Sequence, residues 1–175
     1  MRSLEEFENT ALQYADELFR VARRLVGEPT LAEDLVQETF LQAWKSIDRF
    51  EHGTNLRAWL YKIMLNTHSN LRRKSKIKVV ATEDLIAETI AYDPPAPQGV
   101  TDEEVLAELE KLPRDFLIPV VLVDIEGLAY KELSDVLGIP IGTVMSRLHR
   151  GRKLLRMGLA RMAGEAGYAV GGIKD

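Results

Sequence analysis

Three histidines and one acidic stretch are the residues whose types suit catalysis or metal binding. His52, His68 and His149 are spread along the chain, and the sequence contains no cysteine. Glu33, Asp34 and Glu38 resemble the carboxylates of a metal-binding helix, but the Glu-x-x-His pairs that such helical bundles need are missing. No HExxH sequence, phosphate-binding glycine loop or nucleophile elbow occurs. The sequence therefore predicts a protein that is not an enzyme and uses no metal or cofactor.

The other chemistry that the residues offer is electrostatic binding of a polyanion. Residues 56–82 contain seven lysines and arginines and no acid, and residues 136–162 contain six and no acid. Residues 83–110 contain nine acids and no base, although the net charge of the chain is only −4. Two basic segments separated by an acidic one predict that the chain binds a nucleic acid and contacts it at two places. Because the acidic segment competes for the basic surfaces, we expect the isolated chain to bind DNA weakly.

Helices must position these basic segments. Apolar residues at helical spacing predict helices over residues 4–25 and 30–50 and from residue 55 onward. Thr30 with Glu33, and Thr101 with Glu104, predict capping boxes at two helix starts. The stretch "YDPPAPQG" is typical of a linker. We predict an all-α protein of two small helical domains, residues 1–76 and 101–162, joined by a flexible acidic and proline-rich linker, residues 77–100, and followed by a flexible tail, residues 163–175.

Periodicity also predicts which residues of the first domain face its core. On the second helix these are Val36, Phe40, Ala43, Trp44 and Ile47. On the third helix they are Leu56, Trp59, Leu60, Ile63 and Leu71. The N-terminal sequence lacks the apolar core of a secretory signal, and no run of about 18 apolar residues is present. These features predict a cytoplasmic protein without membrane insertion.

The second basic segment has the pattern of a helix-turn-helix over residues 130–156. Ser134 is small enough for a close helix crossing, and Gly138 occupies the turn position that favours positive φ. Apolar Val144, Leu148 and Leu155 mark the buried face of the second helix, where Gly151 permits close approach. The opposite face carries donors and charges suited to a major groove and its phosphates: Ser146, His149, Arg150 and Lys153.

These segments together resemble the extracytoplasmic-function (ECF) group of bacterial sigma factors in the sigma-70 family. The resemblance rests on "AEDLVQETFLQAWKSIDRF", "GTNLRAWLYKIMLNTHSNLRRK", "LEKLP" and "DIEGLAYKELSDVLGIPIGTVMSRLHRGRKLLR", which occur in the order found in that family. It implies that the chain binds core RNA polymerase and directs it to promoter DNA. It further implies that the first domain docks on the largest polymerase subunits and reads and melts the minus-ten element, and that the second reads the minus-thirty-five element.

The residues that match the polymerase-binding motif of the family are Asp34, Leu35, Val36, Gln37, Glu38 and Phe40. Asp34 and Glu38 lie four residues apart, so both can face a basic helical partner. For Val36 and Phe40 we favour a place in the core over contact with the polymerase.

The residues that match the minus-ten surface of the family are His52, Gly53, Thr54, Asn55, Arg57, Tyr61, Lys62, Asn66, Asn70, Arg72, Arg73 and Lys74. Melting requires a base held in a pocket beside a basic track for the single strand. We expect Trp59 to lie in the core and Tyr61 to face the DNA.

The residues that match the minus-thirty-five reader are Thr143, Ser146, Arg147, His149, Arg150 and Lys153. Met145 stands where relatives often carry a basic residue. This difference argues against contacts from residue 145 to the DNA bases. The helix sequence is most similar to members controlled by zinc-binding anti-sigma proteins, so an anti-sigma factor is a further candidate partner. The alternative function is a stand-alone helix-turn-helix regulator, which would need no polymerase and no single-strand track.

Overall fold

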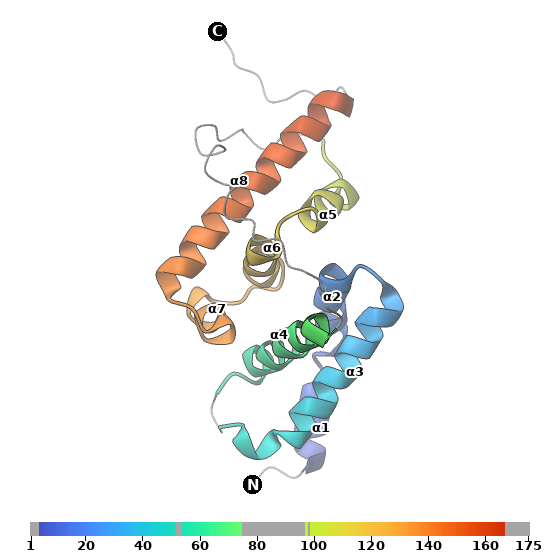
Figure 1. Cartoon of the computed structure of the whole chain (residues 1–175), viewed down its shortest axis with the longest axis vertical. Coiled ribbons are helices and arrows are strands. Elements are labelled where there is room, and N and C mark those ends of the chain that lie inside the picture. The colour runs from blue at the N-terminus through green and yellow to red at the C-terminus, as the bar shows by residue number, and fades with distance from the viewer. Residues whose placement is uncertain (1–3, 52–53, 75–96, 98, 167–175) are drawn as a thin grey trace. The chain divides into compact units, whose positions relative to one another are not determined.

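The chain folds into two compact helical units, and the computed structural model describes residues 4–51, 54–74, 97 and 99–166. Every regular element in these ranges is a helix, which confirms the all-α prediction (Figure 1). Unit 1 comprises Met1–Lys78 and Glu126–Pro140, and unit 2 comprises Val79–Ile125 and Ile141–Asp175. This division differs from the sequence-based one, which kept residues 101–162 together. Most of the expected linker and the end of the expected tail lie outside the described residues.

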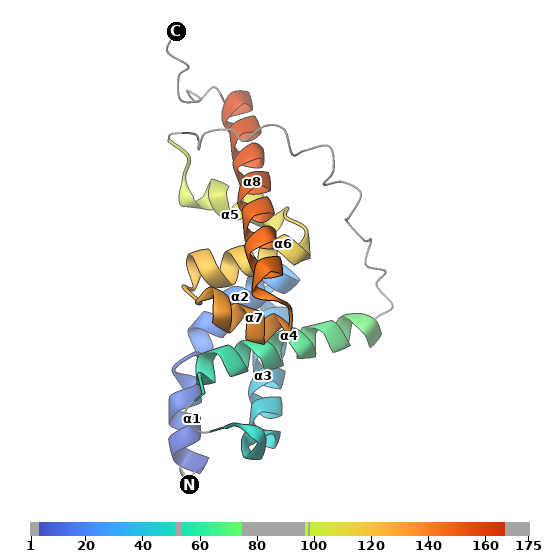
Figure 2. The ribbon, with the colours of Figure 1, turned by 90° about the vertical axis from the view of Figure 1, so that its left-hand side faces the viewer.

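Unit 1 is built on three helices that pack in sequence order. Its elements are α1 (Leu4–Leu12), α2 (Ala15–Val26), α3 (Pro29–Lys45), the 3-10 turn η1 (Ile47–Arg49), α4 (Leu56–Lys74) and α7 (Tyr130–Leu137). Helix α3 packs against both α2 and α4, and α4 also contacts α7. Figure 2 shows α4 running across α3. Helix α4 is therefore held from two sides.

Two helix boundaries in unit 1 differ from the predicted ones. The predicted helix over residues 4–25 is two helices, and Tyr14 between them has φ −93° and ψ 2°. Helix α3 begins at Pro29 after Glu28, whose side chain makes no capping bond, so the predicted Thr30–Glu33 capping box is wrong. Proline suits the first position of a helix because its fixed φ is helical and its missing N–H needs no partner there.

The core face of α3 consists of smaller residues than the sequence pattern predicted. Ala32, Leu35, Thr39 and Ala43 are buried, whereas Trp44 is 44% exposed. The buried Thr39 hydroxyl donates to the Leu35 carbonyl over 2.7 Å, so its burial leaves no hydrogen-bond donor unsatisfied. The predicted inward placement of Trp44 is therefore wrong.

Unit 2 consists of three short elements and one long helix. They are α5 (Asp102–Glu110), α6 (Arg114–Val120) and the π-helical turn η2 (Val121–Ile125), and the long helix is α8 (Ile141–Ala166). Helices α5 and α6 both pack on α8. The Thr101–Glu104 capping box is confirmed, because the Glu104 amide donates to Thr101 Oγ1 over 3.3 Å and the Thr101 amide to Glu104 Oε2 over 2.8 Å.

Glycine sets how closely α8 approaches α6. A Cβ on Gly151 would lie 2.8 Å from Cγ2 of Val120 and 3.2 Å from Cβ of Phe116. These distances are shorter than an unstrained carbon–carbon contact, so only glycine fits at this position. The predicted close approach at Gly151 is confirmed. Helix α8 runs ten residues beyond its predicted end at Arg156. None of the described helices combines the length and apolarity needed to span a membrane.

Candidate nucleic-acid and polymerase surfaces

The residues predicted to bind polymerase lie on α3 and divide between surface and core. Asp34 and Gln37 are exposed, and Val36, Glu38 and Phe40 are half-buried. Leu35 is 1% exposed, so its side chain belongs to the core and cannot meet a partner. Three large apolar side chains that the sequence reasoning left out of this surface are also about half exposed on α3: Leu31, Leu41 and Trp44.

A groove of about 780 Å³ joins part of this surface to α4. Its α3 side carries Asp34, Glu38 and Gln42, and the Gln42 amide donates to Glu38 over 2.7 Å. Its α4 side carries Asn66 and Asn70, two of the predicted minus-ten residues. The acids predicted for polymerase and the asparagines predicted for DNA therefore line one polar groove of unit 1.

A second cavity, of about 420 Å³, lies at the N-terminal end of α4. Thr54, Asn55 and Lys62, all predicted minus-ten residues, line it and are exposed. Its full lining is Arg49, Glu51, Thr54, Asn55, Ala58, Trp59, Lys62, Glu132, Asp135 and Val136. His52 and Gly53, which were predicted to belong to the same pocket, lie outside the described residues.

Of the two aromatic residues of α4, Tyr61 has the opposite placement to the predicted one, and Trp59 is only partly in the core. Trp59 is half-buried, lines the 420 Å³ cavity and packs on Phe50 at a centroid distance of 5.1 Å. Tyr61 has no exposed surface, and its hydroxyl donates to Glu17. The prediction that Tyr61 faces DNA is therefore wrong, and Trp59 is the aromatic side chain beside the predicted pocket.

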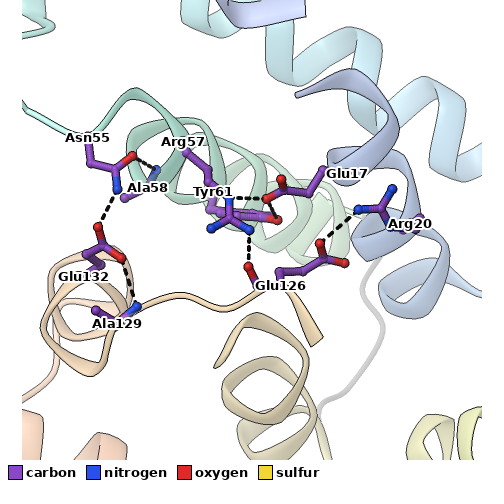
Figure 3. A network of polar contacts seen from close by, with 9 residues as sticks. All are labelled: Glu17, Arg20, Asn55, Arg57, Ala58, Tyr61, Glu126, Ala129 and Glu132. Carbon is purple, nitrogen blue, oxygen red and sulfur yellow. Dashed lines mark hydrogen bonds and ion pairs between the residues drawn. The ribbon is translucent and has the colours of Figure 1, made fainter. Parts of the chain in front are cut away.

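Arg57 and Tyr61 belong to a polar network that joins α2, α4 and the segment before α7 (Figure 3). Arg57 Nε donates to Glu17 Oε1 over 2.5 Å, and Arg57 Nη2 donates to the Glu126 carbonyl. The buried Glu126 carboxylate accepts a hydrogen bond of 3.1 Å from Arg20. Glu17 and Glu126 were not singled out from sequence, because no local motif marks an acid that pairs with an arginine 40 or 106 residues away.

The network changes the protonation equilibria of its members. Burial of the ring and the hydrogen bond to Glu17 raise the pKa of Tyr61 well above its usual range. The hydrogen bond to Glu126 raises the pKa of Arg20. Burial alone would lower the pKa of Arg57, but the hydrogen bond and charge of Glu17 outweigh it and raise the pKa. Tyr61 thus stays neutral and both arginines stay charged at physiological pH.

The remaining minus-ten residues lie at the C-terminal end of α4. Asn66, Asn70 and Arg73 are exposed, Arg72 is half-buried, and Arg73 donates to the Asn70 side chain. Lys74 is the last residue of α4, and its side chain is outside the described part of the chain. Asn66 and Asn70 lie one turn apart, as predicted, so both can face the same groove.

The predicted minus-thirty-five residues occupy the first half of α8. Ser146, His149 and Arg150 are exposed, and Thr143, Arg147 and Lys153 are half-buried. Arg147 lies 3.8 Å from the Asp115 carboxylate, and Ser146 donates to the Thr143 carbonyl over 3.0 Å. A further basic residue, Arg152, forms a bidentate ion pair with Asp124 at 2.6 and 2.9 Å.

The turn before α8 has the geometry that its sequence predicted. Gly138 is in the left-handed conformation with φ 65°, and its amide donates to the Ser134 carbonyl over 2.9 Å. The Ser134 hydroxyl donates to the Ile139 carbonyl over 2.6 Å. The small serine therefore also closes the turn, which the sequence reasoning did not anticipate.

Comparisons with known proteins agree with this arrangement of two helical surfaces. The family model of sigma-70 region 2 matches residues 11–77, and that of sigma-70 region 4 matches residues 102–155. The chain is 38% identical over 173 residues to the ECF RNA polymerase sigma factor SigE of Mycolicibacterium smegmatis, covering 96% of this chain and 67% of the relative. It is 33% identical over 159 residues to SigW of Bacillus subtilis, covering 82% of this chain and 83% of the relative.

Two solved structures are also similar to the chain. The sigma factor RpoE of Bartonella quintana, in complex with the anti-sigma factor NepR, superposes with a TM-score of 0.70 at 27% identity. That match covers 89% of this chain and 98% of RpoE. CnrH, in complex with the cytosolic domain of CnrY, superposes with a TM-score of 0.68 at 27% identity, covering 91% of each chain. The chain therefore belongs to the extracytoplasmic-function sigma factors of the sigma-70 family, which bind core RNA polymerase and initiate transcription at specific promoters.

Proposed function

We propose that α4 and the residues before it read the minus-ten element, that α8 reads the minus-thirty-five element, and that α3 docks on core polymerase. The observation that carries this proposal is the order of the two sigma-70 regions, each with a helix that presents polar and basic side chains. The chain acts by binding and catalyses no reaction of its own. It works in the cytoplasm, where polymerase and chromosome meet.

The minus-ten site centres on the 420 Å³ cavity at the start of α4. Thr54 and Asn55 supply hydrogen-bond groups for a base taken out of the stack, and Trp59 lines the same cavity. Lys62 and the two arginines near the C-terminal end of α4, Arg72 and Arg73, lie along the helix. They can therefore contact successive phosphates of the single strand. His52, Gly53 and Lys74 remain predicted members of this site. Tyr61 has no part in it because it is buried.

The minus-thirty-five site is the exposed face of α8. Ser146, His149 and Arg150 are exposed on successive turns of its first half, the part of a recognition helix that enters the major groove. Thr143, Arg147 and Lys153 flank them and suit phosphate contacts, which make up at least half of the hydrogen bonds in such interfaces. The exposed Met145 offers an apolar contact and no hydrogen-bond donor.

The polymerase surface consists of Asp34, Gln37 and Glu38 together with the apolar side chains around them. Val36 and Phe40 are half-buried and contribute only their exposed edges. Leu31, Leu41 and Trp44 add the apolar area that a stable helical interface needs. An anti-sigma factor is the further partner that we propose, because the similar structures of RpoE and CnrH are complexes with NepR and with the cytosolic domain of CnrY. A zinc-binding anti-sigma factor remains a prediction from the helix sequence.

The test is transcription by purified core polymerase on a pool of genomic fragments, with and without the chain. We expect initiation at promoters that share a two-part motif. The double variant D34A/Q37A should lose holoenzyme formation in gel filtration and also lose transcription. The matched control, E103A/E110A, changes two exposed residues of α5 and should behave as the wild type. Tight DNA binding without polymerase, at a two-fold symmetric site, would instead establish a stand-alone regulator.

A further inference from the structure

The outer face of α8 begins with two exposed apolar side chains. Ile141 is the first residue of the helix and is 45% exposed, and Met145, one turn later, is 51% exposed. Residues four apart on a helix lie on the same side, so the two form one apolar patch. Among the described residues of α8 they are the only exposed large apolar side chains, whereas Val144 and Leu148 are buried. The start of α8 therefore exposes apolar surface that its own packing does not cover.

The residues beside this patch leave it accessible. Gly142 is exposed, and a Cβ at that position would meet nothing within 4 Å. The Ser146 hydroxyl donates to the Thr143 carbonyl over 3.0 Å, so its proton is bound within the helix. A base edge that approaches Met145 therefore meets carbon on one side and a serine oxygen whose proton is already engaged on the other.

Positive charge around the patch indicates what kind of ligand it fits. Arg150 is exposed, Arg147 and Lys153 are half-buried, and residues 136–162 contain no acid. An apolar patch bounded by basic side chains suits an anionic partner that also carries apolar groups. Duplex DNA is such a partner, because thymine presents its C5 methyl group in the major groove. A recognition helix places its N-terminal residues against base edges, and Met145 lies in that part of α8.

The chemistry of methionine suits contact with a methyl group. Methionine cannot donate a hydrogen bond, which is why the sequence argued against contacts from residue 145 to the DNA bases. Contact with a methyl group needs no donor. The methionine side chain is unbranched and polarizable, so it can adapt its shape to a small apolar group. The exposure of Met145 thus makes an apolar base contact available where a hydrogen-bonded one is not.

We propose that Met145 reads a thymine of the minus-thirty-five element through the C5 methyl group of that base, and that Ile141 extends the apolar contact. The inference rests on the proposed minus-thirty-five role of α8. It goes further because it names the base, and the chemical group on it, that one residue recognises. Met145 selects a base by apolar contact, whereas His149 and Arg150 act through hydrogen bonds and charge.

The first test compares thymine with uracil, which has the same hydrogen-bond groups and lacks the methyl group. Core polymerase loaded with the full chain binds synthetic promoter duplexes in which each thymine of the minus-thirty-five element, on either strand, is replaced in turn. We expect replacement at one position to weaken binding about three- to five-fold, the factor that corresponds to one buried methyl group. The variant M145A should weaken binding to the thymine promoter by at least this factor and should not respond to the same replacement. M145L keeps an apolar side chain and should still respond.

The matched control is L106A, which removes an exposed apolar side chain from α5 in the same unit. We expect it to respond to uracil like the wild type. Equal binding of thymine and uracil promoters by the wild type at every position would overturn the proposal. A uracil effect that persists in M145A would overturn it as well, because another residue would then contact the methyl group. Loss of holoenzyme formation by M145A in gel filtration, without a uracil effect in the wild type, would assign the patch to a protein partner instead.

A second measurement uses the unmodified chain, so it does not depend on how a variant folds. At the base pair that responds to uracil, a cytosine–guanine pair is compared with a 5-methylcytosine–guanine pair, which carries the methyl group at the same C5 position. We expect the methylated pair to bind more tightly by a similar factor, about three- to five-fold. Equal binding of the two pairs would contradict recognition of the methyl group.

The same promoters separate this inference from the proposed function. Initiation that is lost when the minus-thirty-five element is scrambled, but unchanged when its thymines become uracils, would remove the inference and leave the function in place. Initiation that is unchanged in both cases would remove the proposed role of α8 and this inference with it.

Discussion

Helices α4 and α8 both come from acid-free basic stretches of the sequence, but the structure uses their charges differently. On α4, Arg57 and Tyr61 turn toward the protein and bind Glu17. On α8, His149 and Arg150 are exposed, and the helix is held by apolar contacts, by the close approach at Gly151 and by the pairing of Arg152 with Asp124. The two helices thus differ in which of their polar side chains remain at the surface.

This difference shows that a basic stretch does not by itself identify a DNA-binding face. Acidic residues elsewhere in the chain determine which basic side chains remain exposed. The Glu17 carboxylate and the backbone carbonyl of Glu126 bind Arg57 in the first half of α4. On α8, Asp115 and Asp124 pair with Arg147 and Arg152 but leave Arg150 exposed. We therefore expect a change at Arg57 of α4 to alter stability and DNA binding together, and changes on the exposed face of α8 to alter DNA binding alone.

The largest expected effect on this comparison comes from replacing Tyr61 with alanine. Removing a fully buried aromatic ring should lower the free energy of unfolding by about 3–5 kcal/mol, because a cavity remains and Glu17 loses a donor. Urea unfolding followed by circular dichroism measures this loss. The neighbouring exposed Lys62→Ala should stay within about 0.5 kcal/mol of the wild type. A Tyr61→Ala protein of wild-type stability with weakened DNA binding would restore the outward placement of Tyr61.

The next test compares one arginine from each helix. Arg150→Ala should lower transcription from a promoter that depends on its minus-thirty-five element about ten-fold, since a base or phosphate contact is worth about 1–3 kcal/mol. Its unfolding free energy should stay within about 0.5 kcal/mol of the wild type. Arg57→Ala should also lower the unfolding free energy, by about 1–3 kcal/mol, because the Glu17 carboxylate and the Glu126 carbonyl lose a donor. Equal stability of the two variants would contradict the distinction.

The packing of α8 is tested by two glycines on the same helix. Gly151→Ala should lower the unfolding free energy of unit 2 by about 1–3 kcal/mol, because the new methyl group would overlap Val120. Gly164→Ala meets nothing within 4 Å and should raise it by up to about 1 kcal/mol, because alanine favours the helix. Thermal unfolding of both variants gives the comparison. A stabilised Gly151→Ala protein would show that α6 and α8 are not closely packed at this point.

The features that the sequence predicted correctly are those that depend on neighbouring residues. The turn at Gly138, the Thr101–Glu104 capping box and the all-α class all follow from local spacing and conformational preference. Close packing at Gly151 was also predicted, because a glycine inside an amphipathic helix needs a packing reason.

The features that the sequence missed depend on residues distant along the chain. Tyr61 was expected outside because its apolar neighbours define a different stripe, but an acid on α2 satisfies its hydroxyl and allows burial. Trp44 was expected inside because it shares the apolar periodicity of its helix, but small residues such as Ala32 and Ala43 form the face that packs. The helix break at Tyr14 was missed because no glycine or proline near it marks the end of a helix. Periodicity identifies helices well, but it does not show which of two mixed faces finds partners.

The smallest expected effect is the pH dependence that Tyr61 gives to unit 1. Its pKa is raised in the folded chain by burial and by the hydrogen bond to Glu17, whereas in the unfolded chain it is near the usual value of about 10. The stabilisation is therefore complete below about pH 10. Above that pH the unfolded chain releases the tyrosine proton while the folded chain keeps it, so the free energy of unfolding falls by up to about 1.4 kcal/mol per pH unit. Tyr61→Phe should cost about 1 kcal/mol at neutral pH and remove this slope.

Urea unfolding of the wild type and of Tyr61→Phe at pH 8 and above pH 10 measures this dependence. The difference between the two proteins isolates Tyr61, because the other tyrosines and the lysines titrate in both. A parallel decline in both proteins would mean that the hydroxyl of Tyr61 titrates alike in the folded and unfolded chain, and that α4 is no more dependent on its polar contacts than α8.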